Sequence, residues 1–91
     1  MPIKEDQFAF NIVTPKGTMY QEKVEFVKAA SLDGEIGILA DHSPALIELK
    51  DGDILAKNQQ NNDSFTITNG FLYIMPEKTL LLCSSCINNN I

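Results

Sequence analysis

Two cysteines and a single histidine are the side chains of this sequence best suited to chemistry. Cys83 and Cys86 have two residues between them, the spacing of thioredoxin-like redox pairs and of half a structural zinc site. A redox pair of that type opens a helix after a strand, but this pair ends a predicted strand with no helical pattern behind it. Two cysteines and one histidine also fall short of a complete structural zinc site. We therefore interpret both thiols as small buried hydrophobic groups.

His42 and the carboxylates offer no catalytic arrangement either. A histidine acts as the base for a nucleophile that it contacts, and no serine or cysteine partner stands at a recognisable spacing from His42. General acid–base work by carboxylates requires a pocket that raises the pKa of one of them. The acidic pairs Glu5-Asp6 and Asp51/Asp53 instead have the neighbours of ordinary solvated turns. The sequence thus predicts no catalytic residue, no metal site and no bound cofactor.

Residues 34–44 form the stretch around which the other elements are arranged. Its two glycines tolerate positive φ or a close approach of another chain, because glycine has no Cβ. Pro44 restrains the residue before it to an extended backbone and stops any helix from running through. We predict a short buried strand that leads into an exposed corner displaying Asp41 and His42. Such a corner suits docking better than catalysis.

Length and charge narrow the possible classes of protein. The chain has 91 residues, no arginine and a formal net charge of −5. This length fits one domain, because domains usually have about 100–150 residues. Binding to a phosphate backbone needs clustered basic residues, so a nucleic-acid partner is excluded. No segment approaches the roughly 18–20 apolar residues of a membrane span, and the first six residues lack a secretory pattern. We expect a soluble, cytosolic protein without direct membrane insertion.

Short alternating segments separated by turn residues predict an all-β fold. Residues 8–14 place Phe8, Phe10 and Ile12 on one face, as in a half-buried strand. We predict a two-sheet β-sandwich or flattened barrel of about eight to ten short, mostly antiparallel strands. The sandwich domain covers residues 1–86, a frayed tail covers residues 87–91, and no helical C-terminal domain follows. Besides the strand of the central stretch, the expected strands are residues 8–14, 18–20, 22–30, 45–49, 54–57, 64–68, 71–75 and 79–84.

Three local patterns carry finer predictions. The alternation slips within residues 22–30, which indicates a β-bulge or a fully buried strand. Asp51-Gly52 and Asn69-Gly70 each lie between apolar runs, and such pairs predict hairpin turns.

Phe71, Tyr73 and Met75 alternate along one predicted strand. We predict that these three side chains belong to the core. The alternative is an exposed apolar patch that binds a partner.

The order of these features resembles the N-terminal β-sandwich domain of the epsilon subunit of F-type ATP synthase, which is called delta in mitochondria. The resemblance begins at residues 10–17 (Phe-Asn-Ile-Val-Thr-Pro-Lys-Gly), is strongest at residues 34–39 (Gly-Glu-Ile-Gly-Ile-Leu) with His42-Ser43-Pro44, and ends at residues 69–74. Many relatives have Pro-Gly before the histidine, where this chain has Ala-Asp. Relatives commonly continue into a helical hairpin that binds ATP or inhibits hydrolysis. The present sequence stops where that hairpin would begin, so we carry over neither property.

The resemblance implies a mechanical, non-catalytic role. The sandwich would sit at the foot of the central stalk, bind the gamma subunit and touch the polar loops of the c-ring, coupling ring rotation to the catalytic F1 head. It would lie peripherally on the cytoplasmic face of the inner (plasma) membrane, as part of F1. The family's glutamate near the c-ring loops corresponds to Glu35, and its corner histidine to His42. The contact residues for gamma or the c-ring are then Glu35, Gly37, Asp41, His42, Ser43 and Pro44.

Other interpretations of the same residues stay open. Glu35 and His42 fit solvated or hydrogen-bonded turn residues as well as contact residues. The whole domain fits a stand-alone β-sandwich binding module for a small ligand or a peptide, which would have a concave pocket. A coupling subunit would instead leave an apolar sheet face open for its partner. A small barrel enzyme has no constellation of residues to support it.

Overall fold

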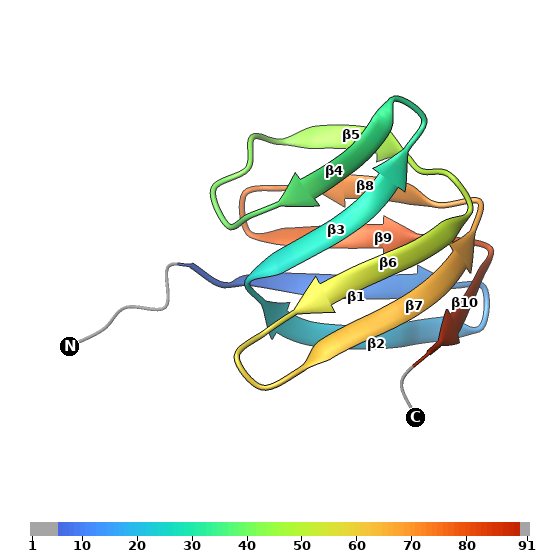
Figure 1. Cartoon of the computed structure of the whole chain (residues 1–91), viewed down its shortest axis with the longest axis horizontal. Helices are drawn as coiled ribbons and strands as arrows, with labels where there is room; N and C mark the ends of the chain where they lie inside the picture. Colours follow the sequence, from blue (N-terminus) through green and yellow to red (C-terminus); the bar gives the residue numbers. More distant parts are fainter. Residues whose placement is uncertain (1–5, 90–91) are drawn as a thin grey trace.

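The computed structural model of this protein describes residues 6–89, and over that range it contains ten strands and no helix (Figure 1). The described range therefore offers no helical segment that could cross a membrane. The strands are β1 (Phe8–Thr14), β2 (Gly17–Val24), β3 (Phe26–Ser31), β4 (Gly34–Ile38), β5 (Ala45–Glu48), β6 (Gly52–Lys57), β7 (Asn62–Thr68), β8 (Phe71–Ile74), β9 (Lys78–Leu82) and β10 (Ser85–Asn88).

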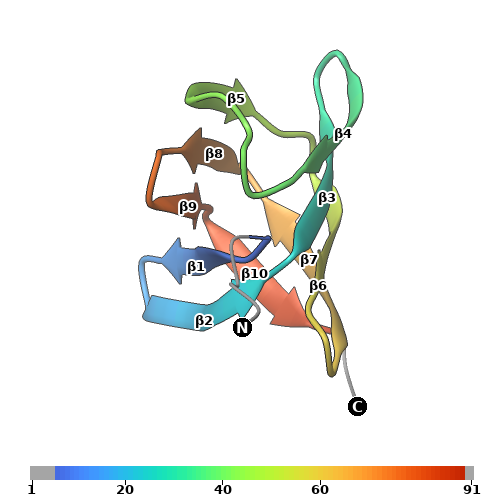
Figure 2. The same cartoon turned by 90° about the vertical axis from the view of Figure 1, so that its left-hand side faces the viewer.

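Two five-stranded sheets stack face to face, and Figure 2 shows them as two layers. The first sheet has the strand order β2-β1-β9-β8-β5, and the second has the order β10-β7-β6-β3-β4. The β1–β9 pair is parallel, and the other pairs between the named strands are antiparallel. The prediction of an all-β, two-sheet sandwich with mostly antiparallel strands is confirmed, and the sheets do not close into a barrel.

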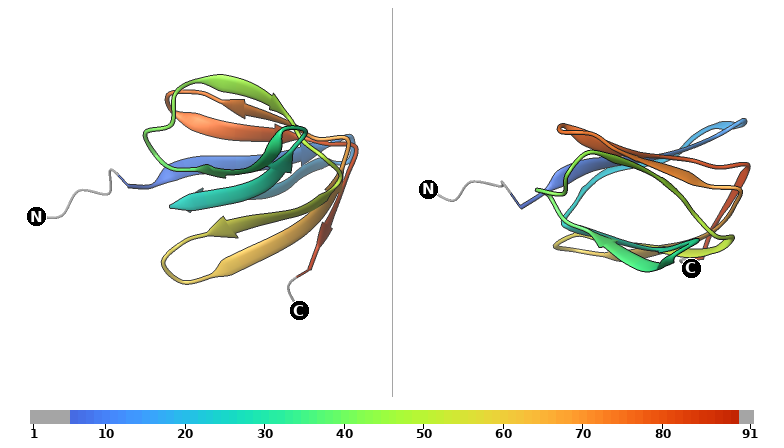
Figure 3. Two further views of the ribbon diagram at one scale, coloured as in Figure 1. Left: turned by 45° about the horizontal axis from the view of Figure 1, so that its top comes forward. Right: turned by 90° about the horizontal axis from the view of Figure 1, so that it is seen from above.

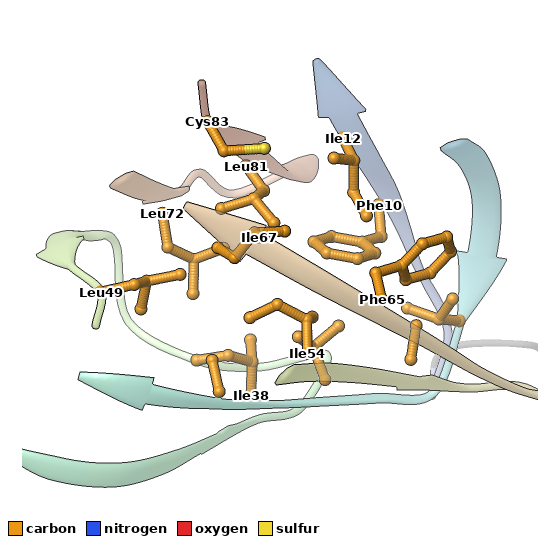
Figure 4. Close-up of a cluster of buried hydrophobic side chains, with 14 of the residues drawn as sticks. Phe10, Ile12, Ile38, Leu49, Ile54, Phe65, Ile67, Leu72, Leu81 and Cys83 are labelled. Carbon is orange, nitrogen blue, oxygen red and sulfur yellow. The ribbon is translucent and has the colours of Figure 1, made fainter. Parts of the chain in front are cut away.

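Alternate side chains of both sheets fill the space between the layers (Figure 4). In β1 the predicted alternation holds, because Phe8, Phe10 and Ile12 are all buried. Phe10 and Ile12 lie in one core cluster with Phe65 and Ile67 of β7, which are at most 1% exposed (Figure 4). Full burial of a side chain of this size contributes about 1.5–3 kcal/mol, so this cluster is the main source of stability.

Both cysteines are free and pack as hydrophobic groups. Cys83 lies in the core at 7% exposure, and Cys86 packs against the core from β10. Burial, with a smaller contribution from the neighbouring Cys86, raises the pKa of Cys83 to about 11. Burial also raises the pKa of Cys86. Thiols of this kind stay protonated at neutral pH, which agrees with the packing interpretation.

Asp51-Gly52 and Asn69-Gly70 connect strands of different sheets, so the prediction of hairpin turns is wrong at both places. Seen from above in Figure 3, connections at the ends of the strands pass from one layer to the other. The two crossings support each other, because the Asn69 backbone N–H donates a 2.9 Å hydrogen bond to the Asp51 carboxylate. The left-handed backbone of Asn69, with φ of 52°, is a local turn property. It does not decide which sheet receives the next strand.

Gly70 is needed at its crossing because of close packing. A Cβ at this position would lie 2.5 Å from Cδ1 of Ile67 and 3.4 Å from Cδ1 of Leu81. The backbone therefore passes directly over the core side chains of both sheets. Only glycine fits without displacing them.

The alternation of apolar residues slips within residues 22–30 because the chain crosses there from the first sheet to the second, which is the third such crossing described. β2 ends at Val24 in the first sheet, β3 begins at Phe26 in the second, and Glu25 lies between them. The prediction of a bulge or a single buried strand there is therefore wrong. A register shift does occur in β2, but it lies opposite the step from Ile12 to Val13.

The C-terminal segment is more ordered than predicted. β10 pairs antiparallel with β7, and the Asn89 side chain donates a 2.9 Å hydrogen bond to the Thr66 hydroxyl. Ile87 and Asn88, which we predicted to lie in a frayed tail, belong to this strand. Residues 90–91 of that tail lie outside the described residues, as do residues 1–5, on which the prediction of no secretory signal largely falls.

Candidate functional site

The glycine-rich motif forms the exposed edge of the second sheet. β4, which carries Glu35 and Gly37, is the last strand of its sheet, and among the described strands it pairs with β3 alone. Of its five residues Ile38 is buried and Ile36 half-buried, and the others are exposed. The prediction of a buried strand is therefore wrong for most of β4. The reason is positional, because the strand has one neighbour and the tip of the β3–β4 hairpin extends past the stacked layers (Figure 2).

Glu35 keeps most of its surface available to a partner. Its carboxylate lies 3.7 Å from the ammonium group of Lys28, and the two side chains are 67% and 47% exposed. Ion pairs at this exposure contribute little to stability and are screened by salt. The ion pair of Glu35 with Lys28 therefore contributes little to the stability of the fold.

Gly37 has a packing role beside its position in the motif. A Cβ there would lie 2.8 Å from Cε1 of Phe26, whose ring covers this part of β4. Any Cβ at residue 37 would displace the end of that ring, so glycine lets the ring stay in place. Packing therefore favours the second glycine of the motif without reference to any partner.

The corner after β4 is an exposed turn. The His42 backbone N–H donates to the Leu39 carbonyl at 3.1 Å, and the ring Nδ1 donates to the Ser43 carbonyl at 2.7 Å. A carbonyl oxygen can only accept, so Nδ1 carries a proton in the second bond. Gly37, Leu39, Asp41 and His42 line a shallow pocket of about 250 Å³.

Three of the six predicted contact residues thus meet at one pocket, namely Gly37, Asp41 and His42. Ser43 and Pro44 are exposed just beyond it, and Glu35 points from the outer face of β4 toward Lys28. Within residues 6–89 no group of three or more histidine, cysteine, aspartate or glutamate side chains could hold a metal ion. The corner can make polar contacts, but it contains no arrangement for bond making.

A second surface lies on the outer face of the first sheet. Phe71 and Tyr73 point outward and are 44% and 40% exposed, while Leu72 and Ile74 fill the core. The prediction that the Phe71 face belongs to the core is therefore wrong, and Met75 is half-buried just after the strand. The alternative of an exposed apolar patch describes what is seen.

The patch extends across four strands as two transverse rows. One row runs from Leu46 through Tyr73 to Leu80, and the other runs from Phe71 through Leu82 to Val13. Side chains opposite each other on neighbouring strands are close enough to touch, so the rows are continuous. We call these residues the apolar stripe: Val13, Leu46, Phe71, Tyr73, Leu80 and Leu82.

The outer face of the second sheet has a different chemistry. There Thr66 donates a 2.8 Å hydrogen bond to Asp53, and the hydroxyls of Thr68 and Ser85 share a 2.7 Å bond. These polar groups are satisfied by their neighbours, and Ile87, which pairs with Thr66, is an exposed apolar side chain on this face. Contiguous exposed apolar surface, such as the apolar stripe on the first sheet, is typical of interaction sites. The stripe is thus the stronger candidate for a binding surface.

Sequence reasoning named only part of the stripe, although a signal for the rest was present. Residues 71–74 and 80–82 are continuous apolar runs rather than alternating ones. Strands of this type have both faces covered, whereas an alternating antiparallel strand has one face in water. The fold covers one face of β8 and β9, and the other remains open.

Comparisons with known proteins agree with this architecture. A family model for the β-sandwich domain of the ATP synthase delta/epsilon chain matches residues 7–89. Proteins named ATP synthase epsilon chain from Bacillus thuringiensis (strain Al Hakam) and Bacillus cereus (strain B4264) are each 36% identical over 83 residues, covering 91% of this chain. The chain spans 62% of the length of these relatives.

Two solved structures have the same fold. A chain of the Euglena gracilis mitochondrial ATP synthase, in a structure of OSCP, F1 and the c-ring, superposes with a TM-score of 0.84 at 19% identity. A chain of the Tetrahymena thermophila mitochondrial ATP synthase, in a structure of the central stalk and c-ring, gives a TM-score of 0.74 at 12% identity. The matches cover 91% and 88% of this chain, and 54% and 65% of the respective neighbours.

Proposed function

Because the chain belongs to the family of ATP synthase delta/epsilon β-sandwich domains, we propose that it is a non-catalytic subunit of the central stalk. In this role it binds the gamma subunit and the polar loops of the c-ring, and it transmits ring rotation to the catalytic head. The observation that carries the proposal is the apolar stripe, since a coupling subunit needs a face that a partner covers. Membership of F1 would place the protein peripherally on the cytoplasmic face of the inner membrane.

The gamma subunit is the partner proposed for the apolar stripe. Leu46, Phe71 and Tyr73 are 59%, 44% and 40% exposed and lie next to one another across β5 and β8. Aromatic and apolar side chains at the centre of an interface carry most of its binding energy. A permanent contact of this kind fits a rotor, whose subunits must turn together.

The c-ring loops are the partners proposed for the corner and for Glu35. Asp41 and His42 of the corner are exposed to solvent. Glu35 is also exposed, and its ion pair with Lys28 is a weak one at 3.7 Å. Electrostatic complementarity fixes the register of a contact more than it adds affinity. Glu35, Asp41 and His42 would therefore align the sandwich on the ring.

The fold connects these two surfaces rigidly. Residues 39–44 run from β4 to β5 and end directly before Ala45, the first residue of β5 and the neighbour of Leu46 of the stripe. The Leu32 backbone N–H donates to the Glu48 carbonyl at 3.3 Å, and the Lys50 N–H donates to the Ala30 carbonyl at 2.8 Å. These bonds join the β3–β4 hairpin to the strand that starts the stripe. A force on the corner would reach the stripe through hydrogen-bonded backbone.

The test is co-expression with the gamma subunit of the same genome, followed by gel filtration. We expect the wild-type chain to co-elute with gamma, and Leu46→Asp and Tyr73→Asp to weaken binding at least about tenfold, because each puts a charge at the centre of an apolar contact. Ile87→Asp is the matched control, since Ile87 is 62% exposed but belongs to β10 of the second sheet.

A second variant separates the two proposed contacts. Glu35→Lys should leave binding to gamma unchanged and should weaken association only when the c-ring is present. Failure of the wild-type chain to bind gamma at any salt concentration would reject the stalk role. A ligand screen for a stand-alone binding module would then be the next step.

A further inference from the structure

We propose that a carboxylate of the gamma subunit is seated between Lys23 and Lys78, on the outer face of the first sheet. This inference rests on the proposed binding of gamma to the apolar stripe. It adds the charge of the bound segment and the direction in which that segment lies.

The two lysines form the walls of a hollow in the sheet. Ala9 of β1 pairs with Lys23 of β2 on one side and with Lys78 of β9 on the other. All three side chains point outward, because Phe8 and Phe10 on either side of Ala9 are buried. A methyl group between two long side chains leaves a depression, and a cavity of about 470 Å³ occupies this place.

The hollow is suited to a negatively charged group. Its lining consists of Ala9, Asn11, Gln21, Glu22, Lys23 and Lys78. The ion pair found within residues 6–89 joins Lys28 and Glu35, so neither lysine of the hollow is neutralised by a described residue. Glu22, the acidic residue of the lining, lies outside ion-pair distance of both ammonium groups.

Neighbouring strands are about 4.8 Å apart, so the α-carbons of the two lysines lie roughly 10 Å apart. Ammonium groups on flexible stems can converge on one carboxylate across that distance. The carboxamides of Asn11 and Gln21, which pair with each other one row further along the strands, supply additional N–H donors.

The hollow borders the apolar stripe directly. Asn11 pairs with Leu80, and Leu80 begins the row that continues through Tyr73 to Leu46. A segment lying along this row therefore reaches Asn11, beside the row of Lys78, Ala9 and Lys23 that forms the hollow. At the opposite end of the stripe, Glu48 pairs with Phe71 and adds a negative charge.

The outer face thus carries the two lysines on β2 and β9 and the carboxylate of Glu48 on β5. A partner segment that is apolar in its middle and acidic at one end fits in one direction only. Complementary charges of this kind suppress the reversed orientation, because like charges would then meet. The lysines are expected to set the direction of the gamma segment, while the stripe supplies most of the affinity.

Two measurements on the complex with gamma test this arrangement. The first compares the affinity of wild type with that of Lys23→Gln/Lys78→Gln over a range of salt concentrations. Lys57→Gln is the control, because Lys57 is an exposed lysine of β6 in the other sheet. We expect the double variant to bind on the order of tenfold more weakly at low salt. The difference should close at about 0.5 M NaCl, and Lys57→Gln should match wild type.

The second measurement is carbodiimide cross-linking, which joins an amine to a carboxylate only where the two groups touch. Peptide mapping should find Lys23 or Lys78 bonded to an aspartate or glutamate of gamma. Thermal unfolding of each variant confirms that the exposed substitutions leave the fold intact.

The outcomes separate this inference from the proposed function. If Leu46→Asp weakens binding but the lysine variant binds like wild type and forms the same cross-links, the seated carboxylate is wrong and the stalk role stands. If inorganic phosphate shifts the amide resonances of Lys23 and Lys78 while gamma binding ignores both lysines, the hollow holds a free anion and the inference is wrong. If the wild-type chain does not bind gamma at all, both fail together.

Discussion

The hydroxyl of Tyr20 donates a 2.7 Å hydrogen bond to Oδ2 of Asp63, and this bond joins the two sheets at their open side. Tyr20 belongs to β2, the edge strand of the first sheet, and Asp63 belongs to β7 of the second. The same ring makes edge contacts with Phe10 and Phe65, at centroid distances of 6.0 and 4.8 Å. The Tyr20 side chain therefore packs against the aromatic core with its ring and links the two sheets with its hydroxyl group.

Tyr20→Phe should destabilise the protein while keeping the aromatic contacts. A hydrogen bond to a charged acceptor contributes about 1.5–3 kcal/mol, and Tyr20 is partly exposed, so we expect a loss of about 1–2 kcal/mol. For a domain of this size each kcal/mol lowers Tm by roughly 4–8 °C. Urea denaturation measures the change, with Tyr73→Phe as the control on the exposed stripe. Equal stability of the two variants would contradict the role given to the bond.

The Tyr20 bond should also make stability depend on alkaline pH. Burial, followed by the hydrogen bond to Asp63, raises the pKa of Tyr20 well above its usual value of about 10. The unfolded chain therefore releases this proton at a lower pH than the folded chain. The stabilisation is complete below about pH 10 and is lost as the pH rises above that value.

Wild type should lose more unfolding free energy than Tyr20→Phe between about pH 9.5 and 11, in a comparison of urea curves. The pKa of Cys83 is raised to about 11, in the same range. Cys83 is present in both proteins, so its effect cancels in the difference between their unfolding free energies. Parallel pH profiles for the two proteins would show that Tyr20 has no raised pKa.

Gly70→Ala should be destabilising because the added methyl group meets the core. Its Cβ would lie 2.5 Å from Cδ1 of Ile67, and overpacking of this kind costs about 1–3 kcal/mol. The double variant Gly70→Ala/Ile67→Val removes the clashing methyl group, so it should be more stable than Gly70→Ala alone. A double-mutant cycle by chemical denaturation gives the coupling. If the two changes are simply additive, the clash is not the cause of the loss.

Leu81 and Leu82 are neighbours in β9 with opposite environments. Leu81 is fully buried, so Leu81→Ala should cost about 2–5 kcal/mol. Leu82 is 38% exposed on the stripe, so Leu82→Ala should cost no more than about 1 kcal/mol. Denaturation curves measure both values. A large loss at Leu82 in the isolated chain would mean that the stripe supports the fold rather than a partner.

The two thiols should differ in reactivity. Cys83 is buried with its pKa at about 11, whereas Cys86 is half-buried at the surface strand β10. Reaction requires the thiolate and access to it. With a disulfide reagent at about pH 8, the Cys83→Ser variant should react through Cys86 faster than Cys86→Ser reacts through Cys83. Equal rates would contradict the burial of Cys83.

Much of the fold could be predicted because β-structure leaves a local signature. The alternation of Phe8, Phe10 and Ile12 identified both the strand and its buried face, since side chains on a strand point alternately to its two sides. The motif at residues 34–39 and the family features around it pointed to the sandwich before any contact was known. The corner with Asp41 and His42 was also expected to be exposed, because its proline and its polar residues do not suit a core.

The tertiary structure alone decided three things. Asn69-Gly70 determines a local backbone bend, but whether β8 returns to the same sheet depends on distant strands that offer free hydrogen-bonding edges. β4 is exposed because it became an edge strand, which follows from strand order and not from its own residues. Phe71 and Leu72 are both apolar, so only the position of the second sheet decides which one is buried. Periodicity is a property of neighbouring residues, whereas sheet membership and coverage are set by contacts between residues far apart in the chain.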